Sequence, residues 1–595
     1  MNLRSFPGVM PQSEGAANRK LGLPSEAIAT AFCEQLAGRH AVPKDKIEEL
    51  KHRAKWLDES IDQLALREGL LSETELRDLL SAIGGVRTVS LVQTRIAPDA
   101  VERVPATAVS RCRMMPIQIW DERMVLASDR LIEHGEAEQL RILLGTAIEW
   151  VLCTPHELTE CIKHYYGVGL KSFLDVDAQK RRVDDAEGGA EPPPGMTGFV
   201  EQLLDEAIQA NATDVHVEPR EEGLRVRYRI DGILYPVTLP IGVDRFRRAI
   251  VSSVKVMAQL NIAERRLPQD GRFTRALGSN AYDIRVSVLP ARHGETINLR
   301  ILNRQSTFLD LEMLGLSAQQ RAEMENLIGL EHGLVLFTGP TGSGKTTSLY
   351  AALARLNTDE RKIVTLEDPV EYDLAGITQM QVQPEIGFTF PTGLRSILRH
   401  DPDVILIGEI RDAETASIAV GSALTGHLVL STLHTQDAAG AVVRLMDMGV
   451  EPYLVASSVQ GMIAQRLLRR ICLNCREAYH EDPRVEAEAR GLFPDVGENM
   501  PFYRGRGCPA CRFIGYTGRQ AVFEVFLMND DLRHLVVERA STSVLTQRAL
   551  AIGLSPLRRN AWACALDGTT TVGDVLRMTR RPAFHPAAKQ DLLNL

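Results

Sequence analysis

FTGPTGSGKTTSLY, residues Phe337 to Tyr350, is the most informative stretch of this chain. It matches the phosphate-loop pattern G-x-x-x-x-G-K-[ST], in which Gly339, Gly344, Lys345 and Thr346 occupy the fixed positions. The glycines let backbone N–H groups surround a phosphate, the lysine reaches the β- and γ-phosphates, and the threonine hydroxyl binds Mg²⁺. The apolar run GLVLFT precedes the loop and helix-forming residues follow it, which argues against a chance glycine loop. The sequence therefore predicts a site for ATP or GTP. The residues predicted to bind the nucleotide from this loop are Gly339, Pro340, Thr341, Gly342, Ser343, Gly344, Lys345, Thr346 and Thr347.

Acidic residues follow two other apolar runs. In DPDVILIGEIRD, Glu409 comes just after the run 404–407, and in TLEDPVEY, Glu367 and Asp368 close a second run. Ligands in folds of parallel strands bind at the carboxyl ends of the strands, so we expect these carboxylates to meet at the phosphate loop. Glu409 is predicted to orient the attacking water, with Glu367 as a second catalytic carboxylate. Asp368 and Thr346 are predicted to hold Mg²⁺. A solvated charge cluster is the alternative interpretation.

Histidines bracket a third apolar run, TGHLVLSTLHTQD. A lone histidine beside a strand is more often structural. A pair that flanks one strand of a phosphate-binding sheet can also report the presence of a γ-phosphate. His434 and His427 are therefore predicted to contact the nucleotide.

Four of the nine cysteines form two C-x-x-C pairs. CLNC contains Cys472 and Cys475, and CPAC contains Cys508 and Cys511. Together they supply four thiolates, the full ligand set of a closed structural zinc site. The segment between the pairs exceeds the usual short spacing, which predicts an inserted lobe held at its base by the metal. A redox pair is the alternative, but no thioredoxin-like pattern surrounds either pair.

Length and charge set further limits. The chain has 595 residues, too many for one core, and a formal net charge of −9. Dedicated nucleic-acid binders usually carry a basic domain, so this acidic balance argues mildly against one. No apolar run reaches the roughly 18 to 20 residues that span a bilayer, and the N-terminus lacks the apolar core of a signal peptide. We therefore expect a cytoplasmic protein whose membrane role, if any, is peripheral.

Changes in composition divide the chain. Asp231-Gly232 in LRVRYRIDGILYPV marks a hairpin, and the short apolar runs around the phosphate loop are typical of buried parallel strands. Charged and then Gly/Pro-rich residues up to Gly195 are typical of a linker. The predicted segments are a flexible tail (1–25), an N-terminal adaptor domain (26–167), a linker (168–195), a second N-terminal domain (196–305), a phosphate-binding core (306–470), a zinc lobe (471–526) and a C-terminal helical region (527–595).

Together these motifs resemble one family, the hexameric ATPases of type II secretion and type IV pilus assembly. GPTGSGKTT, TLEDPVEY, RHDPDVILIGEIRDAETA and GHLVLSTLHT are similar to its Walker A, Asp box, Walker B and His box. NATDVHVEP, RVRYRIDG, KVMAQLNIAERRLPQDGR and DIRVSVLP are similar to its second N-terminal domain. The resemblance extends from about Met196 to the C-terminus. It implies an α/β fold with a RecA-like P-loop core, a preceding PAS-like α+β domain and a homo-hexameric ring.

The resemblance also implies arginines that reach the γ-phosphate from a neighbouring domain or subunit. Arg285 and Arg300 are the first candidates, and Arg395 and Arg399 are the second. Arg411 could instead pair with the acidic strand ends. An ordinary surface ion pair is the alternative for each of them.

Residues 26–167 resemble, more loosely, the N-terminal domain of the family, which binds an inner-membrane partner and in some members cyclic di-GMP. IDQLALREGLLSETELRDLLSAIGG keeps the leucine spacing and Gly69 of the nucleotide-binding repeat. It lacks the Arg-Leu-Gly start and the terminal glutamine. The sequence therefore favours an adaptor domain over a second-messenger site.

The resulting hypothesis is Mg²⁺-dependent ATP hydrolysis by a ring. Closure of the second N-terminal domain and the core on the nucleotide would turn a membrane platform that adds pilin-like subunits to a fibre. The expected ligands are ATP, Mg²⁺ and Zn²⁺. The expected partners are an inner-membrane platform protein and a membrane-anchored protein with a cytoplasmic domain, with no dedicated nucleic acid. A retraction motor, a DNA-uptake or nucleic-acid motor and a non-hydrolysing scaffold are the alternatives, and the sequence does not separate secretion from pilus assembly.

Overall fold

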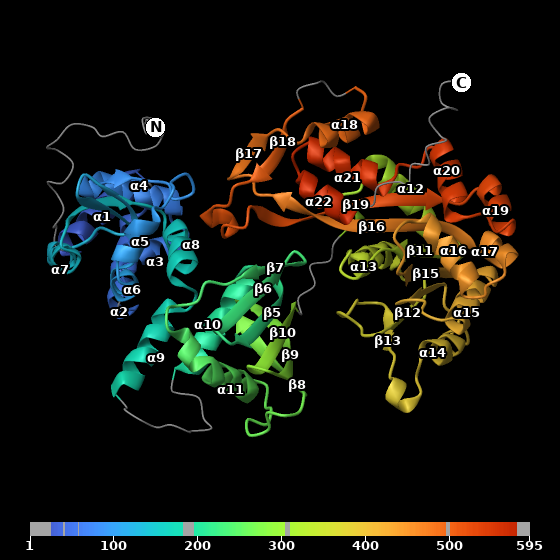
Figure 1. Cartoon of the computed structure of the whole chain (residues 1–595), viewed down its shortest axis with the longest axis horizontal. Helices are drawn as coiled ribbons and strands as arrows, with labels where there is room; N and C mark the ends of the chain where they lie inside the picture. Colours follow the sequence, from blue (N-terminus) through green and yellow to red (C-terminus); the bar gives the residue numbers. More distant parts are fainter. Residues whose placement is uncertain are drawn as a thin grey trace. The chain divides into compact units, whose positions relative to one another are not determined.

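The computed structural model describes residues 25–39, 42–57, 59–182, 195–303, 310–495 and 500–579 (Figure 1). The chain divides into two compact units. Unit 1 contains Met1–Asn303, Cys472–Cys475 and Gly505–Gly515, and unit 2 contains Arg304–Ile471, Arg476–Arg504 and Tyr516–Leu595. The cysteine pairs therefore belong to unit 1, although they are inserted in the sequence of unit 2.

The N-terminal domain combines helices with a four-stranded sheet in the order β1-β4-β3-β2. Helix α4 begins after Ser72, whose hydroxyl accepts the backbone N–H of Glu75, while the Glu75 carboxylate accepts the backbone N–H of Ser72. This reciprocal capping box satisfies two backbone donors that the first turn would leave unpaired. The helices are α1 (Ser25–Arg39), α2 (Lys44–Leu57), α3 (Ile61–Arg67), α4 (Glu73–Gly84), α5 (Pro98–Arg103), α6 (Ala106–Cys112), α7 (His134–Leu144) and α8 (Pro155–Tyr166), and the strands are β1 (Arg87–Thr88), β2 (Met114–Trp120), β3 (Arg123–Ser128) and β4 (Ala147–Leu152).

Helix α9 (Leu170–Arg182) occupies part of the predicted linker, 168–195. Phe173 and Val176 of this helix are 2% and 1% exposed and belong to the core of the second domain. The prediction that the linker begins at residue 168 is therefore wrong, because these apolar side chains are packed. Residues 183–194 of the predicted linker and 1–24 of the predicted tail lie outside the described residues.

The second domain contains a six-stranded antiparallel sheet in the order β7-β6-β5-β10-β9-β8. Asp231 and Gly232 have φ angles of 49° and 80° between β6 and β7, which confirms the predicted tight hairpin turn. Helices α10 and α11 pack on the apolar face of this sheet (Figure 1). The elements are α10 (Met196–Gln209), β5 (Ala212–Arg220), β6 (Gly223–Ile230), β7 (Ile233–Pro236), the 3₁₀ helix η1 (Val243–Phe246), α11 (Arg247–Met257), β8 (Gln269–Leu277), β9 (Asn280–Ala291) and β10 (Gly294–Asn303).

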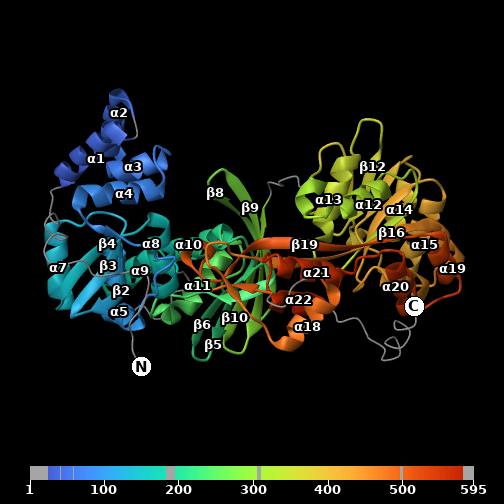
Figure 2. The same ribbon diagram turned by 90° about the horizontal axis from the view of Figure 1, so that it is seen from above.

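Unit 2 is built on a seven-stranded sheet in the order β13-β12-β14-β15-β11-β16-β19. The strands are parallel from β13 to β16, and β19 runs antiparallel to β16. Figure 2 shows β16 and β19 side by side. Every residue of β11 (Gly333–Thr338), β14 (Val404–Ile407) and β15 (Leu428–Leu433) is buried. Continuous burial of this kind is expected where helices cover both faces of a parallel sheet. The predicted α/β core with its phosphate loop after an apolar strand is confirmed.

Strand β19 (Tyr516–Leu527) changes the predicted boundary of the zinc lobe, 471–526. It pairs with β16 (Val459–Ile471) along nearly its whole length, and its side chains Phe523 and Phe526 are each 1% exposed. These residues therefore belong to the sheet, because its core buries their rings. The cysteine-bearing insertion is correspondingly shorter, 472–515.

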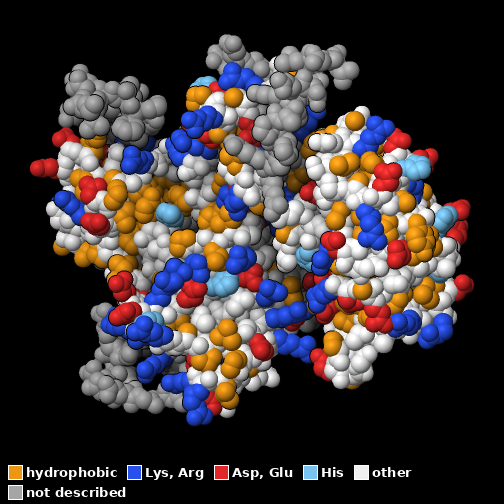
Figure 3. Space-filling model, turned by 45° about the vertical axis from the view of Figure 1, so that its right-hand side comes forward, with side chains coloured by type: hydrophobic (Ala, Val, Ile, Leu, Met, Phe, Trp, Pro, Cys, Tyr) orange, Lys and Arg blue, Asp and Glu red, His pale blue; other side chains and the backbone are white. Residues whose placement is uncertain are grey.

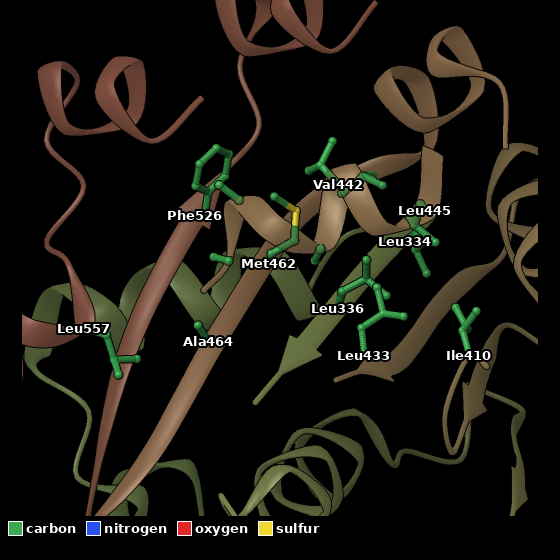
Figure 4. Close-up of a cluster of buried hydrophobic side chains, with 14 of the residues drawn as sticks. Leu334, Leu336, Ile410, Leu433, Val442, Leu445, Met462, Ala464, Phe526 and Leu557 are labelled. Atoms are coloured by element: carbon green, nitrogen blue, oxygen red, sulfur yellow. The ribbon is translucent and has the colours of Figure 1, made fainter. Parts of the chain in front are cut away.

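The helices of unit 2 cover this sheet and close its core. Figure 4 shows part of that core, where the side chains of Met462 of β16 and Phe526 of β19 lie on the face of the sheet that carries α16 and its Val442. The last four helices lie in the predicted C-terminal helical region, 527–595. The remaining elements of unit 2 are η2 (Leu311–Leu314), α12 (Ala318–Ile328), α13 (Lys345–Leu356), β12 (Ile363–Glu367), β13 (Thr378–Gln381), η3 (Pro384–Ile386), α14 (Phe390–Ile397), α15 (Ala413–Leu424), α16 (Ala439–Asp447), α17 (Pro452–Ser458), β17 (Arg476–Tyr479), α18 (Pro483–Leu492), β18 (Phe502–Gly505), α19 (Asp530–Val537), α20 (Thr542–Ala551), α21 (Leu557–Leu566) and α22 (Val572–Met578).

Replacing Phe526 by alanine is expected to destabilise the sheet of unit 2. Truncating a fully buried phenylalanine costs about 3–5 kcal/mol, since it removes apolar contacts and leaves a cavity. Hydrogen exchange of peptides from β16 and β19 at increasing urea concentrations measures the loss. Val537→Ala, at a side chain that is 50% exposed, is the control and should change stability by less than about 0.5 kcal/mol. Equal exchange in the two variants would contradict the packing of β19.

Candidate nucleotide and metal sites

The phosphate loop runs from the end of β11 to the start of α13, the strand–loop–helix order that the sequence predicts. A Cβ atom at Gly339 would lie 2.5 Å from the Ser343 Oγ and 2.7 Å from the backbone oxygen of Gln465. A Cβ atom at Gly344 would lie 2.8 Å from the Gln465 Nε2. Glycine is therefore required at both positions, because the loop is wrapped tightly against β16.

The ammonium group of Lys345 is held over this loop. Its Nζ donates to the carbonyl of Gly339 at 2.8 Å and to that of Pro340 at 3.2 Å. Burial lowers the pKa of Lys345 to about 8, while the charge of Glu409 opposes this shift and the charge of Arg466 adds to it. The lysine is the first residue of α13, so its charge adds to the positive end of the helix dipole. The loop therefore concentrates positive potential where a phosphate would bind.

Hydrogen bonds join the loop to the neighbouring strand ends. The backbone N–H of Gly339 donates to the carbonyl of Leu433, the last residue of β15, at 3.3 Å. The backbone N–H of Gly408, directly after β14, donates to the carbonyl of Leu366 in β12 at 2.8 Å. The carboxylates and the histidine that follow these strands are thereby brought to the edge of the sheet that carries the phosphate loop, as the sequence predicts.

Glu409 is the centre of a charged cluster at this edge. Its carboxylate accepts a hydrogen bond from Arg411 at 2.5 Å and lies 3.3 Å from the Nε2 of His434. Burial alone would raise the pKa of Glu409, but the hydrogen bond and charge of Arg411 outweigh it and hold the pKa below its ordinary value. Arg411 also lies 4.0 Å from the carboxylate of Asp368. Glu409 is therefore an ionised carboxylate that can orient a water molecule.

Glu367 lies deeper, at 4% exposure. Its carboxylate accepts the hydroxyl groups of Tyr350 and Thr365, the latter at 2.6 Å. Burial, and then the bond to Glu367, raise the pKa of Tyr350 well above its ordinary value. Both oxygens of Glu367 thus have partners in its own sheet and in α13, and its catalytic role stays a prediction. The side chain of Asp368, by contrast, is 42% exposed at the strand end.

The two predicted histidines lie at opposite ends of β15. His434 follows the strand and meets Glu409, whereas His427 precedes it and its Nδ1 lies 2.9 Å from the carbonyl oxygen of Ser422. The six strand residues between them span about 20 Å at about 3.3 Å per residue. The structure therefore corrects the prediction for His427, because residues that flank one strand come to opposite edges of the sheet. Of the predicted pair, His434 is the one that lies beside Glu409.

The second pair of candidate arginines, Arg395 on α14 and Arg399 just after it, already have partners within unit 2. Arg395 pairs with Glu414 at 2.5 Å, and Arg399 donates to the carbonyl of Arg395 at 2.7 Å. The ion pair and the hydrogen bond are both exposed, so they contribute little to stability.

The first-choice arginines lie in unit 1. Arg285 on β9 and Arg300 on β10 are directly opposite each other, and the Arg300 Nε lies 3.2 Å from the Asp214 carboxylate. The same cross-strand row contains Arg272 on β8 and Arg229 on β6. These residues form a basic row on the polar face of the sheet, opposite the face that α10 and α11 cover.

Gln465 and Arg466 are part of this site and are absent from the sequence prediction. Gln465 accepts the hydroxyl of Ser348 at 2.9 Å, and Arg466 donates to the carbonyls of Gln465 and Gln436 at 2.9 and 2.6 Å. The two residues are 2% and 7% exposed. The usable signal is a polar pair inside the apolar run GMIAQRLL, because buried polar groups need specific partners.

The four cysteines of the predicted zinc site come together within unit 1, and all are buried. Their sulfur atoms lie within 4.8 Å of one another, with separations of 3.9 Å for Cys472–Cys508, 3.8 Å for Cys475–Cys511 and 3.7 Å for Cys508–Cys511. A tetrahedral site with Zn–S bonds of about 2.3 Å has S–S edges of about 3.8 Å. Burial raises the pKa of Cys475 to about 11, so thiolates here need a compensating cation. The donor set fits Zn²⁺.

Acidic and basic side chains are mixed on one face of the molecule. Lys and Arg side chains lie beside Asp and Glu side chains on the face that Figure 3 shows, and the net charge is −9. Within the described ranges, no helix is both long and apolar enough to cross a membrane.

Two family models match the sequence. The family described as Type II/IV secretion system protein matches residues 195–577, and the MshEN domain matches residues 84–171. The first match contains the phosphate loop, the acidic strand ends and the four cysteines. The second lies mostly within the N-terminal domain.

Known relatives span most of the chain. The type IV pilus assembly ATPase PilB of Myxococcus xanthus is 40% identical over 532 residues, which are 87% of this chain and 93% of its own. The type II secretion system protein E of Pectobacterium carotovorum subsp. carotovorum is 48% identical over 382 residues, 64% of this chain and 75% of its own. The type II secretion system ATPase E of Vibrio cholerae serotype O1 is 46% identical over 460 residues, 77% of this chain and 89% of its own.

Replacing Cys475 by serine is expected to abolish tight zinc binding, because it removes one of four thiolate ligands. Mass spectrometry of the purified full chain should find about one zinc ion per chain in the unmodified protein. Cys564→Ser, outside the cluster, is the control and should keep the metal. Absence of zinc from the unmodified protein, or equal zinc in both variants, would contradict the assignment.

Proposed function

The chain belongs to the type II/IV secretion system protein family, and we propose on this basis that it hydrolyses ATP to power assembly of a pilus or pseudopilus. Relatives named for pilus assembly and for type II secretion both match most of the chain. The proposal therefore covers either system. The geometry of the phosphate loop supports the ATPase part, and the relatives support the assembly part.

One observation carries the proposal: an ionised carboxylate stands at the same sheet edge as the phosphate loop. Glu409 is close enough to Lys345 for its charge to influence the lysine, and His434 and Arg411 hold its carboxylate. A nucleotide-binding scaffold needs only the loop. The added carboxylate can activate water, which favours hydrolysis over binding alone.

The residues divide the work of hydrolysis. Backbone N–H groups of the phosphate loop and the ammonium of Lys345 would bind the β- and γ-phosphates, and the nucleotide would lie against residues 339–347. Glu409 would accept a hydrogen bond from the attacking water and orient it toward the γ-phosphorus. His434, beside Glu409, would register whether the γ-phosphate is present. Glu367 would stabilise this edge of the sheet by accepting hydrogen bonds from Tyr350 and Thr365.

The hydroxyl of Thr346 and the carboxylate of Asp368 would hold Mg²⁺. When bound, this ion neutralises negative charge on the β- and γ-phosphates. Arginines supply further positive charge in related reactions, and one such group is worth about 10³–10⁵ in rate. Arg285 and Arg300, in the basic row of the second domain, are the proposed source. Arg395 and Arg399 are weaker candidates because contacts on α14 already engage them.

ATPases of this family are generally hexameric and work with membrane platform proteins. We propose a homo-hexamer that acts in the cytoplasm, peripheral to the inner membrane, with a platform protein and a membrane-anchored partner. Zn²⁺ in the tetracysteine site would be structural, because all four ligands come from the protein. A retraction motor is less well supported, since the relatives reported above are named for assembly and secretion.

Replacing Glu409 by glutamine is expected to leave ATP binding intact and to slow phosphate release by about 10²–10⁴-fold, because an amide is a poor proton acceptor. Steady-state phosphate release and binding of a fluorescent nucleotide measure the two effects separately. Glu414→Gln, at an exposed carboxylate on α15, is the control and should hydrolyse ATP at the unmodified rate. Full turnover by the Glu409 variant would contradict the assigned role.

Replacing Arg411 by glutamine is expected to shift the acidic limb of the pH–rate profile to higher pH. Arg411 holds the pKa of Glu409 below its ordinary value, so the carboxylate stays ionised, and activity persists, as pH falls. Without that guanidinium the carboxylate takes up a proton at a higher pH and activity is lost earlier. The profile of an Arg321→Gln control, which removes a surface pair with Glu312, should not move. An unshifted profile for the Arg411 variant would show that Glu409 does not control this limb.

A further inference from the structure

Two segments of unit 1, Cys472–Cys475 and Gly505–Gly515, carry the four cysteines and form what we call the metal knuckle. The metal knuckle also contacts other parts of unit 1. Three consecutive residues after Cys511 reach two other parts of unit 1. Arg512 and Phe513 meet α8 of the N-terminal domain, and Arg512 and Ile514 meet the second domain. These contacts play no part in the nucleotide site.

Arg512 joins a buried ion cluster between two helices. Its Nε lies 3.4 Å from the carboxylate of Glu160 on α8 and 3.3 Å from that of Glu206 on α10. Lys163 on α8 also pairs with both carboxylates. Glu160 and Glu206 are 5% and 7% exposed. Two cations balance two buried anions here, so removal of Arg512 would leave an uncompensated negative charge.

Apolar and backbone contacts surround this cluster. The ring of Phe513 stacks on that of His164, with centroids 4.0 Å apart and planes at 25°, and its edge meets Tyr165. The guanidinium of Arg506 donates to the carbonyl of Val92 at 3.1 Å. Ring stacking adds to the contacts of the ion cluster. The knuckle therefore presents a continuous docking surface to the N-terminal domain.

The shape of this surface depends on the cysteines. Arg512 and Phe513 have φ angles of 50° and 63°, left-handed values that are unfavourable for residues other than glycine. Their backbone N–H groups donate to the carbonyls of Pro509 and Cys508 at 3.0 and 2.9 Å, within the turn that joins two metal ligands. The N–H of Gly515 donates to the Cys511 sulfur at 3.3 Å. A metal that fixes these sulfur atoms also fixes the turn that aims Arg512 and Phe513.

We propose that zinc in the tetracysteine site holds the N-terminal domain against the second domain through the Arg512–Glu160–Glu206–Lys163 cluster. The inference rests on the zinc site of the proposed function and adds a partner for it, the N-terminal domain of the same chain. The metal knuckle then stabilises its own loop and also docks the N-terminal domain. Its two segments are continuous in the chain with β16 and β19.

Hydrogen exchange of the full chain tests the proposal, with zinc content and ATP turnover measured on the same samples. Arg512→Gln should keep its zinc but speed exchange in peptides from α8 and α10 by about tenfold or more, since a buried charge loses its partner. Cys475→Ser should lose zinc and show the same local increase. Arg504→Gln, which removes a surface pair with Glu477, is the matched control and should change neither.

A charge exchange separates docking from general damage to the fold. Arg512→Glu alone should speed exchange in α8 and α10, and the double variant Arg512→Glu with Glu206→Arg should restore protection, because the cluster again has no net charge. Unchanged exchange in Arg512→Gln, absence of rescue, or equal protection with and without zinc would overturn the proposal. Loss of ATP turnover in Glu409→Gln is independent of these readouts, so failure of the docking proposal and failure of the ATPase proposal are distinguishable.

Discussion

Hydrogen bonding between parallel strands holds the nucleotide site together. The bond from Gly339 to Leu433 ties the phosphate loop to the end of β15, and the bond from Gly408 to Leu366 ties β14 to β12. Because the strands run in one direction, their carboxyl ends meet, and groups from distant parts of the sequence face the same phosphate. A shift of one residue in this pairing would turn each side chain to the opposite face of the sheet. The buried core is what keeps the register.

Sequence patterns predict the parts of this protein that depend on neighbouring residues. The phosphate loop, the Asp231-Gly232 turn and the C-x-x-C pairs each owe their structure to residues close in the chain, and the structure contains all three. Features set by distant pairing are not predictable in the same way. His427 resembles His434 in sequence context but lies at the other end of β15. Gln465 accepts a hydrogen bond from Ser348 of α13, more than a hundred residues earlier in the chain. Likewise, the sequence places most of β19 in the zinc lobe, and only the pairing of β19 with β16 shows that this strand belongs to the sheet.

The metal knuckle shows the same division between local and distant signals. Its cysteine spacing identifies a zinc ligand set from the sequence alone. Its contacts with α8 and α10 cannot be read from spacing, since Glu160 and Glu206 belong to other domains. The knuckle belongs to unit 1 although the sequence on either side of it builds unit 2, so unit 1 is completed by segments far along the chain from the rest of it.

The most direct measurement of the central claim is affinity capture of the full chain from detergent-solubilised membranes, loaded with Mg²⁺ and a non-hydrolysable ATP analogue, followed by mass spectrometry. The account predicts nucleotide-dependent recovery of a polytopic platform protein with a membrane-anchored partner, and the substrates that accompany them would identify secretion or pilus assembly. A Lys345→Ala sample provides the control, because it removes the lysine of the phosphate loop. Recovery of nucleic acid, or of no membrane protein under any nucleotide condition, would contradict the assignment of this motor to an assembly machine.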